Sequence, residues 1–346
     1  MRAERRPLGE VPADDYARLV GESFFASPGF PELWRALGGR PVAWTVETEG
    51  ALAAVLPGVE FGRGPLARFA SMPDGCYGGL FVDPALERER ETLARVLFAG
   101  LAGRHYAKAF VFDFHGLVPC GPGFDAMRCE TALVDISDPG WMPADRKLRA
   151  QIRKAQREGL RLEPFDWDRH HAGFLALTAL TARGHGLRPR YTAAFFEALA
   201  GLARRDARVR WVWCQHDGRP VCSHIYFVQG GILQAWQSCF DRDFSYLKPN
   251  QFVRFSVCRE MAGRGVSWLN LGSTPEGSPG LAHFKARWGG RRVAYHGYVR
   301  REGLGLLVGG PRRQLSPVRE EVPLLRPDLV PGSARAVAEA TGYRVR

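Results

Sequence analysis

The alternation of apolar and polar residues predicts the same order of elements in both halves of the chain. Residues 12–37 have helical periodicity, and residues 40–61 form two strand-like runs joined at Glu49-Gly50. In the second half, residues 188–204 predict a helix and residues 208–228 predict two strands joined at Asp217-Gly218. An acidic residue followed by glycine favours a tight hairpin turn, so we expect one β-hairpin in each half.

The same order continues after each hairpin. An apolar stripe at helical spacing begins near Pro84 and leads into the strand-like run 108–114. A second helix begins near Pro249 and leads into the run 266–272. These repeats predict a duplicated α/β unit with a cleft where its halves meet, which is where proteins usually bury a ligand. We therefore expect domains at residues 1–160 and 161–305, followed by a Pro/Arg-rich tail at 306–346.

Basic residues outnumber acidic ones, with 48 Lys and Arg against 36 Asp and Glu and a formal charge of +12. This charge favours an anionic partner, such as nucleic acid, nucleotide phosphates or an acidic membrane surface, although a merely solvated basic surface is the alternative. The sequence has no apolar run of the length that spans a bilayer and no signal-type start. We expect a cytoplasmic protein without a membrane span.

A helix predicted at the join between the halves carries a stripe of arginines beside a narrow apolar face. Arg146, Arg149, Arg153 and Arg157 recur at spacings of three and four residues. The stripe as a whole predicts contact with an anion, whereas any one of these arginines is as well explained by a solvated helix face.

Familiar catalytic patterns are missing from the sequence. It contains no G-x-S-x-G elbow, no H-E-x-x-H helix and no phosphate-binding G-x-x-x-x-G-K-[ST] loop. The seven cysteines and nine histidines lack the spacing of a zinc site, so we expect no metal. Hydrolase, kinase and metalloenzyme functions are disfavoured.

Three stretches together resemble the FemAB-like branch of the GNAT (N-acetyltransferase) superfamily over about residues 12–300. The first is the Tyr77-Gly78-Gly79 segment. The second is the basic helix of the form R-x-x-I-R-K-A-x-x-x-G, from Arg149 to Gly159. The third is a strand ending at Gly272, followed by G-L-x-x-F-K-x-x-x-G from Gly280 to Gly289.

The resemblance implies an α/β (α+β) fold of two tandem GNAT-like domains, each a mixed, mainly antiparallel sheet flanked by helices. It also implies an acyltransferase. Fem-type enzymes move an aminoacyl group from a charged tRNA to an amine of a peptidoglycan precursor, and other members of the branch are linked to exopolysaccharide or cell-envelope work. A small polar amine is then the acceptor, and tRNA is a candidate partner.

By the same resemblance, Phe284 and Lys285 lie at the acceptor pocket. Lys285 would hold a carboxylate or stabilise the tetrahedral intermediate, whereas its alternative is an exposed helix residue. Arg287 is a weaker candidate for the same anion. Tyr77, Gly78, Gly79, Arg149, Arg153, Tyr191 and Asn250 complete the expected substrate-binding residues; packing alone also explains Tyr191 and Asn250.

The acyl donor stays open between aminoacyl-tRNA and acyl-CoA, and no tightly bound cofactor is expected. We find no Q/R-x-x-G-x-G/A loop that opens a helix after a strand, which disfavours ordinary CoA binding. A CoA-dependent N-acetyltransferase on the same fold and a non-catalytic protein that binds a nucleotide-sugar or RNA are the alternatives. The sequence leaves the oligomeric state open.

Overall fold

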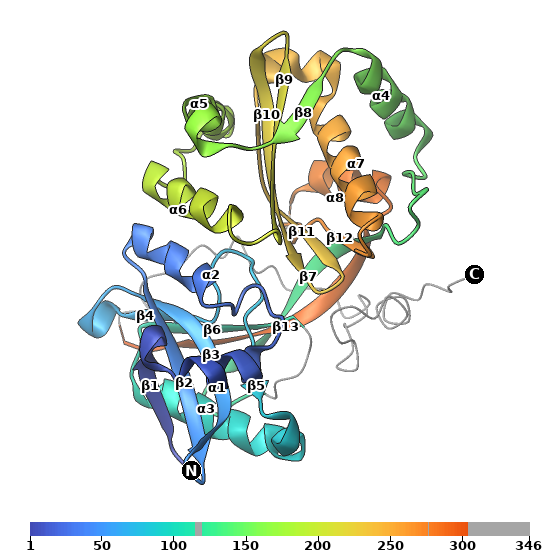
Figure 1. Cartoon of the computed structure of the whole chain (residues 1–346). Helices are drawn as coiled ribbons and strands as arrows, with labels where there is room; N and C mark the ends of the chain where they lie inside the picture. Colours follow the sequence, from blue (N-terminus) through green and yellow to red (C-terminus); the bar gives the residue numbers. More distant parts are fainter. Residues whose placement is uncertain (115–119, 276, 304–346) are drawn as a thin grey trace. The chain divides into compact units, whose positions relative to one another are not determined.

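The chain folds into two compact units. The computed structural model describes residues 1–114, 120–275 and 277–303 (Figure 1). The first unit contains Met1–Glu130 and the described residues from Val293 on, and the second contains Thr131–Arg292. The chain therefore crosses from one unit to the other within two strands.

The first unit is built on a mostly antiparallel sheet. Its strands are β1 (Ala3–Pro7), β2 (Arg40–Thr48), β3 (Ala51–Phe61), β4 (Arg68–Ala70), β5 (Phe81–Val82), β6 (Lys108–Asp113) and β13 (Arg291–Arg301). Their order is β1-β2-β3-β4-β6-β13, and β5 pairs with β3. The pair β4 and β6 is parallel, and the other pairs in this order are antiparallel.

Helices cover both faces of this sheet because successive strand residues point to opposite sides. The helices are α1 (Ala13–Val20), α2 (Gly29–Glu32) and α3 (Arg90–Gly103). Trp44 of β2 packs with the apolar stripe of α3, including Leu97. Its neighbour Ala43 packs with Tyr16 and the rest of the cluster under α1. The helix predicted from Pro84 is this α3, preceded by a 3₁₀ turn at Pro84–Glu89.

The second unit also has a mostly antiparallel sheet. Its strands are β7 (Asp125–Asp135), β8 (Arg161–Pro164), β9 (Val209–His216), β10 (Arg219–Gln229), β11 (Ile232–Phe240) and β12 (Trp268–Asn270). They lie in the order β7-β12-β11-β10-β9-β8. The central pair β11 and β12 is parallel, and its neighbours are antiparallel.

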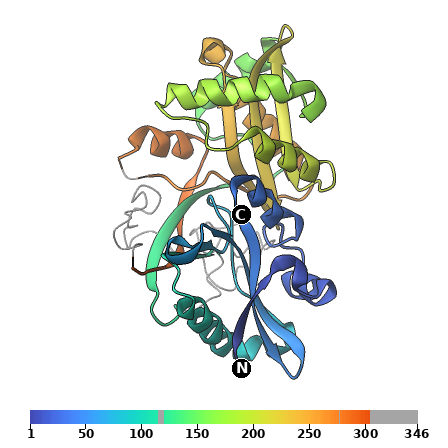
Figure 2. The ribbon, with the colours of Figure 1, turned by 90° about the vertical axis from the view of Figure 1, so that its left-hand side faces the viewer.

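Five helices lie against this second sheet. They are α4 (Arg146–Arg157), α5 (Trp167–Gly184), α6 (Ala193–Ala203), α7 (Pro249–Ala262) and α8 (Pro279–Arg287). Helices α5 and α6 cover one face, and α4, α7 and α8 lie on the other (Figure 1; the long α5 crosses the sheet in Figure 2). Val212 of β9 packs in the α4/α7 core, whereas the adjacent Trp211 contacts Phe174 and Phe196 of α5 and α6.

Both predicted hairpins are confirmed. Glu49 and Gly50 have φ of 55° and 81°, and Asp217 and Gly218 have φ of 48° and 74°. Two consecutive residues with positive φ are typical of the type I′ turn, whose twist matches that of the flanking strands. The fold class expected from the sequence, a mixed α/β structure with mainly antiparallel sheets flanked by helices, is confirmed.

The packing divides the chain at a different place from the predicted boundary at residue 160. Helix α4 belongs to the second unit because Leu148 and Ile152 pack against Val253 and Val257 of α7. The strand β13 returns the chain to the first unit before the predicted end of the second domain at 305. The predicted tail, residues 306–346, lies outside the described residues.

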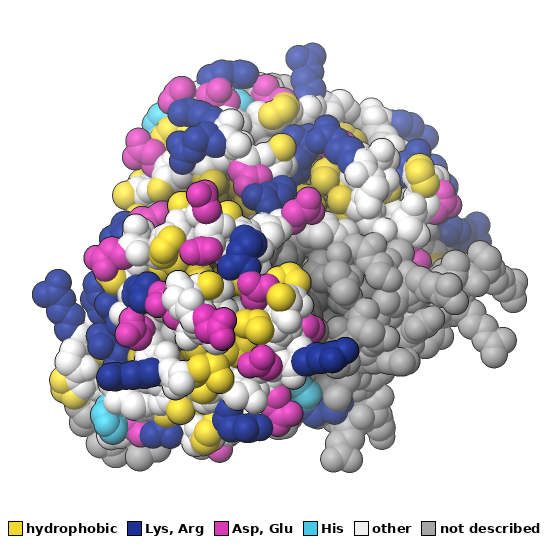
Figure 3. Space-filling view, turned by 60° about the horizontal axis from the view of Figure 1, so that its bottom comes forward, with side chains coloured by type: hydrophobic (Ala, Val, Ile, Leu, Met, Phe, Trp, Pro, Cys, Tyr) yellow, Lys and Arg dark blue, Asp and Glu magenta, His cyan; other side chains and the backbone are white. Residues whose placement is uncertain are grey.

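On the face shown in Figure 3, basic charge is mixed with acidic charge. In the view of Figure 3, Lys and Arg side chains alternate with Asp and Glu side chains across the described surface. The net charge of +12 therefore does not by itself mark a binding site. Within the described ranges, no helix is long and apolar enough to cross a membrane.

Candidate functional site

In the second unit, two parallel strands separate because β12 ends at Asn270 while β11 continues. β12 pairs with β11 at three positions, the last joining Asn270 to Gln234. β11 continues to Phe240, with its other edge still paired to β10. Backbone groups on the β12 side of this stretch have no partner on β12. An unpaired strand edge is a natural place for an extended ligand to form backbone hydrogen bonds.

A fixed loop follows β12 at the point of separation. The buried side chain of Asn270 accepts hydrogen bonds from the Thr131 hydroxyl and from the backbone N–H of Gly272 (2.8 Å). Gly272 has φ of 72°, a conformation that favours glycine. Its carbonyl accepts from the Ala132 N–H at 3.2 Å. The loop is therefore tied to β7 and β12.

Lys285 holds the same loop from the other side. Its Nζ donates to the carbonyl oxygens of Gly272 (2.6 Å) and Ser273 (2.7 Å), and the residue is 3 % exposed. The alternative that Lys285 is an exposed helix residue is wrong. Buried lysines are rare because removing an ammonium group from water is costly, so its burial at the end of a central strand points to a specific role.

A second buried cation was missed by the sequence analysis. Arg254 of α7 is 8 % exposed, and its guanidinium lies 5.1 Å from the ring centre of Phe284 and 5.6 Å from that of Trp288. Its Nε has no hydrogen-bond partner, and no carboxylate of the described residues lies within 4 Å. The aromatic faces stabilise the cation only in part. An uncompensated buried charge is costly, and an anionic ligand would offset that cost.

Arg254 belongs to a polar chain inside the apolar core. Its guanidinium hydrogen-bonds to the hydroxyl of Tyr226, which lies 2.9 Å from Nδ1 of His224. Nε2 of His224 lies 2.7 Å from Oδ1 of Asn250, which is only an acceptor. His224 therefore carries its proton on Nε2 and accepts from Tyr226. Burial, with Arg254 nearby, lowers the pKa of His224 to about 3, so the ring is neutral.

The unpaired stretch of β11 contains another unsatisfied polar group. Oε1 of Gln237 is buried and has no hydrogen-bond donor among the described residues. Buried acceptors in native proteins nearly always have a donor, so an orphaned one indicates that a ligand or water supplies it. Gln237 lies three residues beyond the last position at which β11 pairs with β12.

Two of the three arginines predicted to bind substrate, Arg149 and Arg287, make contacts within the protein. Arg287 donates to Oδ1 of Asp145 at 3.0 Å, which ties α8 to the start of α4. Arg149 donates to the carbonyl oxygens of Pro143 (2.9 Å) and Ala144 (2.6 Å). Arg153 is exposed on α4. Their substrate-binding roles stay predictions.

Tyr191 lies on the opposite face of the second sheet from Lys285, and the Tyr77-Gly78-Gly79 segment belongs to the first unit. Tyr191 packs on the α6 face of the second sheet. The centre of its ring lies 5.0 Å from that of Trp236 and 4.7 Å from that of Phe195. Tyr77 belongs to the first unit, where its ring stacks 3.9 Å from Phe114.

Gly78 allows close packing in the first unit, because a Cβ there would lie 2.0 Å from Oγ of Ser71.

Phe284 and Asn250 contact the polar chain of Arg254 and His224 in the second unit. Of the predicted residues, Phe284, Lys285 and Asn250 are thus brought to the α7/α8 side of the second sheet. No group of three or more His, Cys, Asp or Glu side chains suited to a metal occurs within the part of the chain that the structure covers.

One signal in the sequence could have identified Arg254. It occupies the same helical face as Cys258 and Met261, four and seven residues later, and both are buried. A charge on the apolar stripe of an amphipathic helix must be paired, solvated or used by a ligand.

Comparisons with known proteins agree with this architecture. Residues 146–286 match the family model of the acetyltransferase (GNAT) domain, a range that contains α4, the separating strands and Lys285. A search of curated protein sequences finds no match. The expected resemblance to the GNAT superfamily is thus matched by a family model over residues 146–286.

Solved structures share the fold across most of the chain. FemX has a TM-score of 0.66 at 11% identity, covering 88% of this chain and 99% of its own. The C-terminal domain of a putative lysylphosphatidylglycerol synthetase from Agrobacterium fabrum has a TM-score of 0.55 at 16% identity, covering 87% and 99%. A tandem GNAT protein from the clavulanic acid biosynthesis pathway has a TM-score of 0.51 at 16% identity, covering 87% and 99%. At these identities the similarity establishes the fold alone.

Proposed function

We propose that the protein is a FemAB-related N-acyltransferase that moves an aminoacyl or other acyl group to an amine, because residues 146–286 match the acetyltransferase (GNAT) domain model. The acceptor we propose is a small polar amine of a cell-envelope, peptidoglycan or exopolysaccharide-related molecule. The fold shared with FemX and with a putative lysylphosphatidylglycerol synthetase supports aminoacyl transfer. The observation that carries the proposal is the buried Lys285 at the point where β11 and β12 separate.

The reaction joins a neutral amine to an activated carbonyl. The amine nitrogen attacks the carbonyl carbon, the C–N bond forms, and the carbonyl oxygen becomes negatively charged. Collapse of this intermediate breaks the bond to the leaving group, which departs as a thiol or a hydroxyl after receiving a proton that the amine loses. The site must therefore stabilise an oxyanion and exclude competing water.

Lys285 has the position and charge for the first task. Two carbonyl oxygens at the end of β12 fix its ammonium group, so the cation does not have to reorganise when charge develops on the substrate. Donors of this kind typically contribute about 3–4 kcal/mol to the stabilisation of the transition state.

Arg254 and its neighbours supply the polar surroundings of the substrate. The uncompensated guanidinium of Arg254 favours an acceptor or donor that brings a carboxylate or phosphate to the α7/α8 side of the sheet. The carboxamide of Asn250, oriented by neutral His224, can donate to a substrate carbonyl.

A CoA-dependent N-acetyltransferase is the second candidate. The matched family model is that of an acetyltransferase domain, and the separating parallel strands offer a backbone edge to an extended thioester donor. The missing Q/R-x-x-G-x-G/A loop argues against it. The donor decides between the two candidates, so the experiment tests both donors.

The test compares transfer from a mixture of aminoacyl-tRNAs and from acetyl-CoA to a panel of amines that includes peptidoglycan precursors. We expect aminoacyl-tRNA to support amide formation and the Lys285→Ala variant to lose at least about 100-fold in kcat. The Lys147→Ala variant removes an exposed lysine of α4 and should keep full activity.

Three outcomes separate the alternatives. Turnover with acetyl-CoA alone would assign the protein to the second candidate. Equal kcat in Lys285→Ala and wild type, with the fold intact by circular dichroism, would refute the role of Lys285. Binding without turnover on any donor would favour a non-catalytic protein that holds a nucleotide-sugar or RNA.

A further inference from the structure

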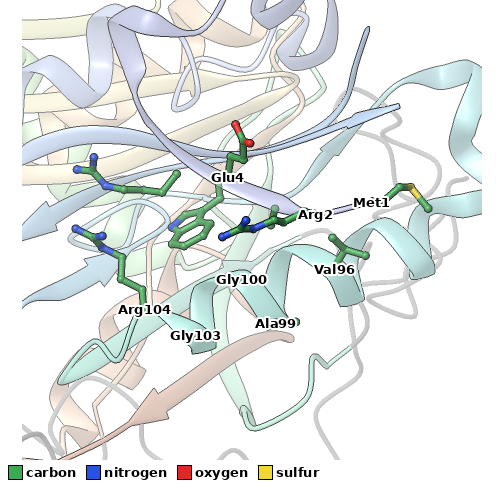
Figure 4. A pocket seen from close by; sticks show the side chains of 11 residues that line it. Met1, Arg2, Glu4, Val96, Ala99, Gly100, Gly103 and Arg104 are labelled. Carbon is green, nitrogen blue, oxygen red and sulfur yellow. The ribbon is translucent and has the colours of Figure 1, made fainter. Parts of the chain in front are cut away.

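A groove in the first unit lies between the edge strand β1 and helix α3. Its volume is about 710 Å³. Its lining includes Arg2, Arg5 and Arg104, together with Gly100 and Gly103 of α3. Figure 4 shows Arg2 and Arg104 reaching over the surface of α3 from two sides. The acyl transfer proposed above does not use this groove.

Positive charge is in excess beside the groove because several arginines share one carboxylate. The buried Glu60 accepts from Arg5 through both oxygens, at 3.0 and 2.7 Å, and lies 3.2 Å from Nε of Arg104. Nη2 of Arg40 lies 3.5 Å from Oε2 of Glu60, and the hydroxyl of Tyr106 donates a hydrogen bond to Oε1 of Glu60. One negative charge cannot neutralise three guanidinium groups, so the cluster retains two positive charges.

The carboxylate of Glu4, next to Arg5 in the sequence, does not neutralise this excess positive charge. The carboxylate of Glu4 points away from α3 and the groove (Figure 4), and it pairs with Arg6 at 2.9 Å. Arg2 makes no hydrogen bond or ion pair to the residues that the structure describes. Arg104 has one such ion pair, through Nε to Glu60. The guanidinium nitrogens of Arg2 and both Nη groups of Arg104 are thus available to a ligand.

The floor of the groove is formed by small residues of α3. Val96, Ala99, Gly100 and Gly103 recur at spacings of three and four residues, so they lie along one side of the helix. At Gly100, a Cβ would lie 2.6 Å from that of Ala3, so glycine lets α3 approach β1 closely. At Gly103, a Cβ would meet only open space. The surface of α3 next to Arg104 therefore leaves space in which a ligand can contact Arg2 and Arg104.

We propose that this groove binds the phosphate groups of a nucleotide or nucleic acid. Arginine suits this ligand because its planar fork donates two parallel hydrogen bonds to phosphate oxygens. The excess charge of the Glu60 cluster attracts the anion, and Arg2 and Arg104 contact it directly. The carboxylate of Glu60 is itself fully engaged by Arg5 and Tyr106, which keeps it from repelling the ligand.

Two probes distinguish the sources of the phosphate. Inorganic pyrophosphate, measured by calorimetry, stands for a free nucleotide; a labelled 12-nucleotide single-stranded RNA, measured by anisotropy over a salt series, stands for a nucleic acid. We expect the Arg2→Ala/Arg104→Ala variant to lose at least tenfold in affinity for the probe that binds. The Arg95→Ala variant removes an exposed arginine of α3 that pairs with Glu91 outside the groove, and we expect it to lose less than twofold.

The salt dependence identifies the source. If RNA binds, loss of two phosphate contacts should lower the slope of log affinity against log salt by about 1.4. Pyrophosphate binding that depends on both arginines, without tighter binding of RNA, would assign the groove to free nucleotides. The single variant Arg2→Ala guards against unfolding, since Arg2 supports no other described residue. Failure of both probes to bind, or equal affinities in wild type and in the variants of Arg2, would overturn the proposal.

Discussion

The neutral His224 makes the stability of the second unit depend on pH. Burial and Arg254 lower the pKa of this histidine in the folded protein to about 3, whereas an unfolded histidine has a pKa of about 6.5. Below pH 6.5 the unfolded chain therefore binds a proton that the folded chain does not bind. The contribution of His224 to stability is complete above pH 6.5 and is lost as the pH falls towards 3.

The size of this effect follows from the two pKa values. Between pH 7.5 and pH 4.5, protonation of His224 in the unfolded state should lower the free energy of unfolding by about 3 kcal/mol. The His224→Gln variant removes the titration, although it can also lower the overall stability. The expected result is therefore a difference in pH dependence: the free energy of unfolding of the wild type should fall by about 3 kcal/mol more than that of the variant over this range.

Urea unfolding followed by tryptophan fluorescence measures this difference. Seven of the nine tryptophans lie in the second unit, so the signal chiefly reports its unfolding. The His185→Gln variant is the control because His185 is exposed, and it should keep the pH dependence of the wild type. Parallel pH dependences in wild type and His224→Gln would refute the reasoning, because they would mean that folding does not perturb His224.

Three further predictions follow from buried contacts. Gly78→Ala should lower the free energy of unfolding of the first unit by about 1–3 kcal/mol, because its Cβ would meet Ser71, whereas Gly79→Ala, which faces open space, should have little effect in the same urea titration. Arg254→Met should leave the second unit as stable or make it more stable by about 1–4 kcal/mol, while the KM for the substrate rises; a large loss of stability would show that Arg254 is already compensated. Glu60→Ala should destabilise the first unit by about 3–5 kcal/mol, because it leaves three arginines without their carboxylate, and an unchanged melting temperature would contradict this.

Local chemistry made the hairpins and the long helices predictable from the sequence. A Glu-Gly or Asp-Gly pair fixes its turn whatever the rest of the chain does, because only a few residue types tolerate positive φ. The unit boundary at Glu130 depends on packing between distant segments, such as Leu148 of α4 against Val253 of α7. No local pattern records such contacts.

The site shows the same division between local and distant causes. A motif located Lys285 and Phe284, because the spacing of residues around them is local. In the fold, Lys285 holds the carbonyl oxygens of Gly272 and Ser273. This contact depends on packing between α8 and the loop after β12, which no local pattern shows. Arg254 belongs to no motif, and its aromatic partner Phe284 lies 30 residues away in the sequence.

Lys285 and Arg254 place two cations on the same side of the second sheet, and their protein partners differ in kind. Carbonyl oxygens solvate Lys285, whereas aromatic rings and a phenol hydroxyl surround Arg254. Carbonyl dipoles stabilise an ammonium group in a fixed position, as an oxyanion stabiliser requires. Aromatic faces leave most of the charge of a guanidinium uncompensated, as an anion-binding residue requires. The two surroundings therefore suit the two different tasks that we propose, the stabilisation of charge on the reacting carbonyl by Lys285 and the binding of an anionic group of the substrate by Arg254.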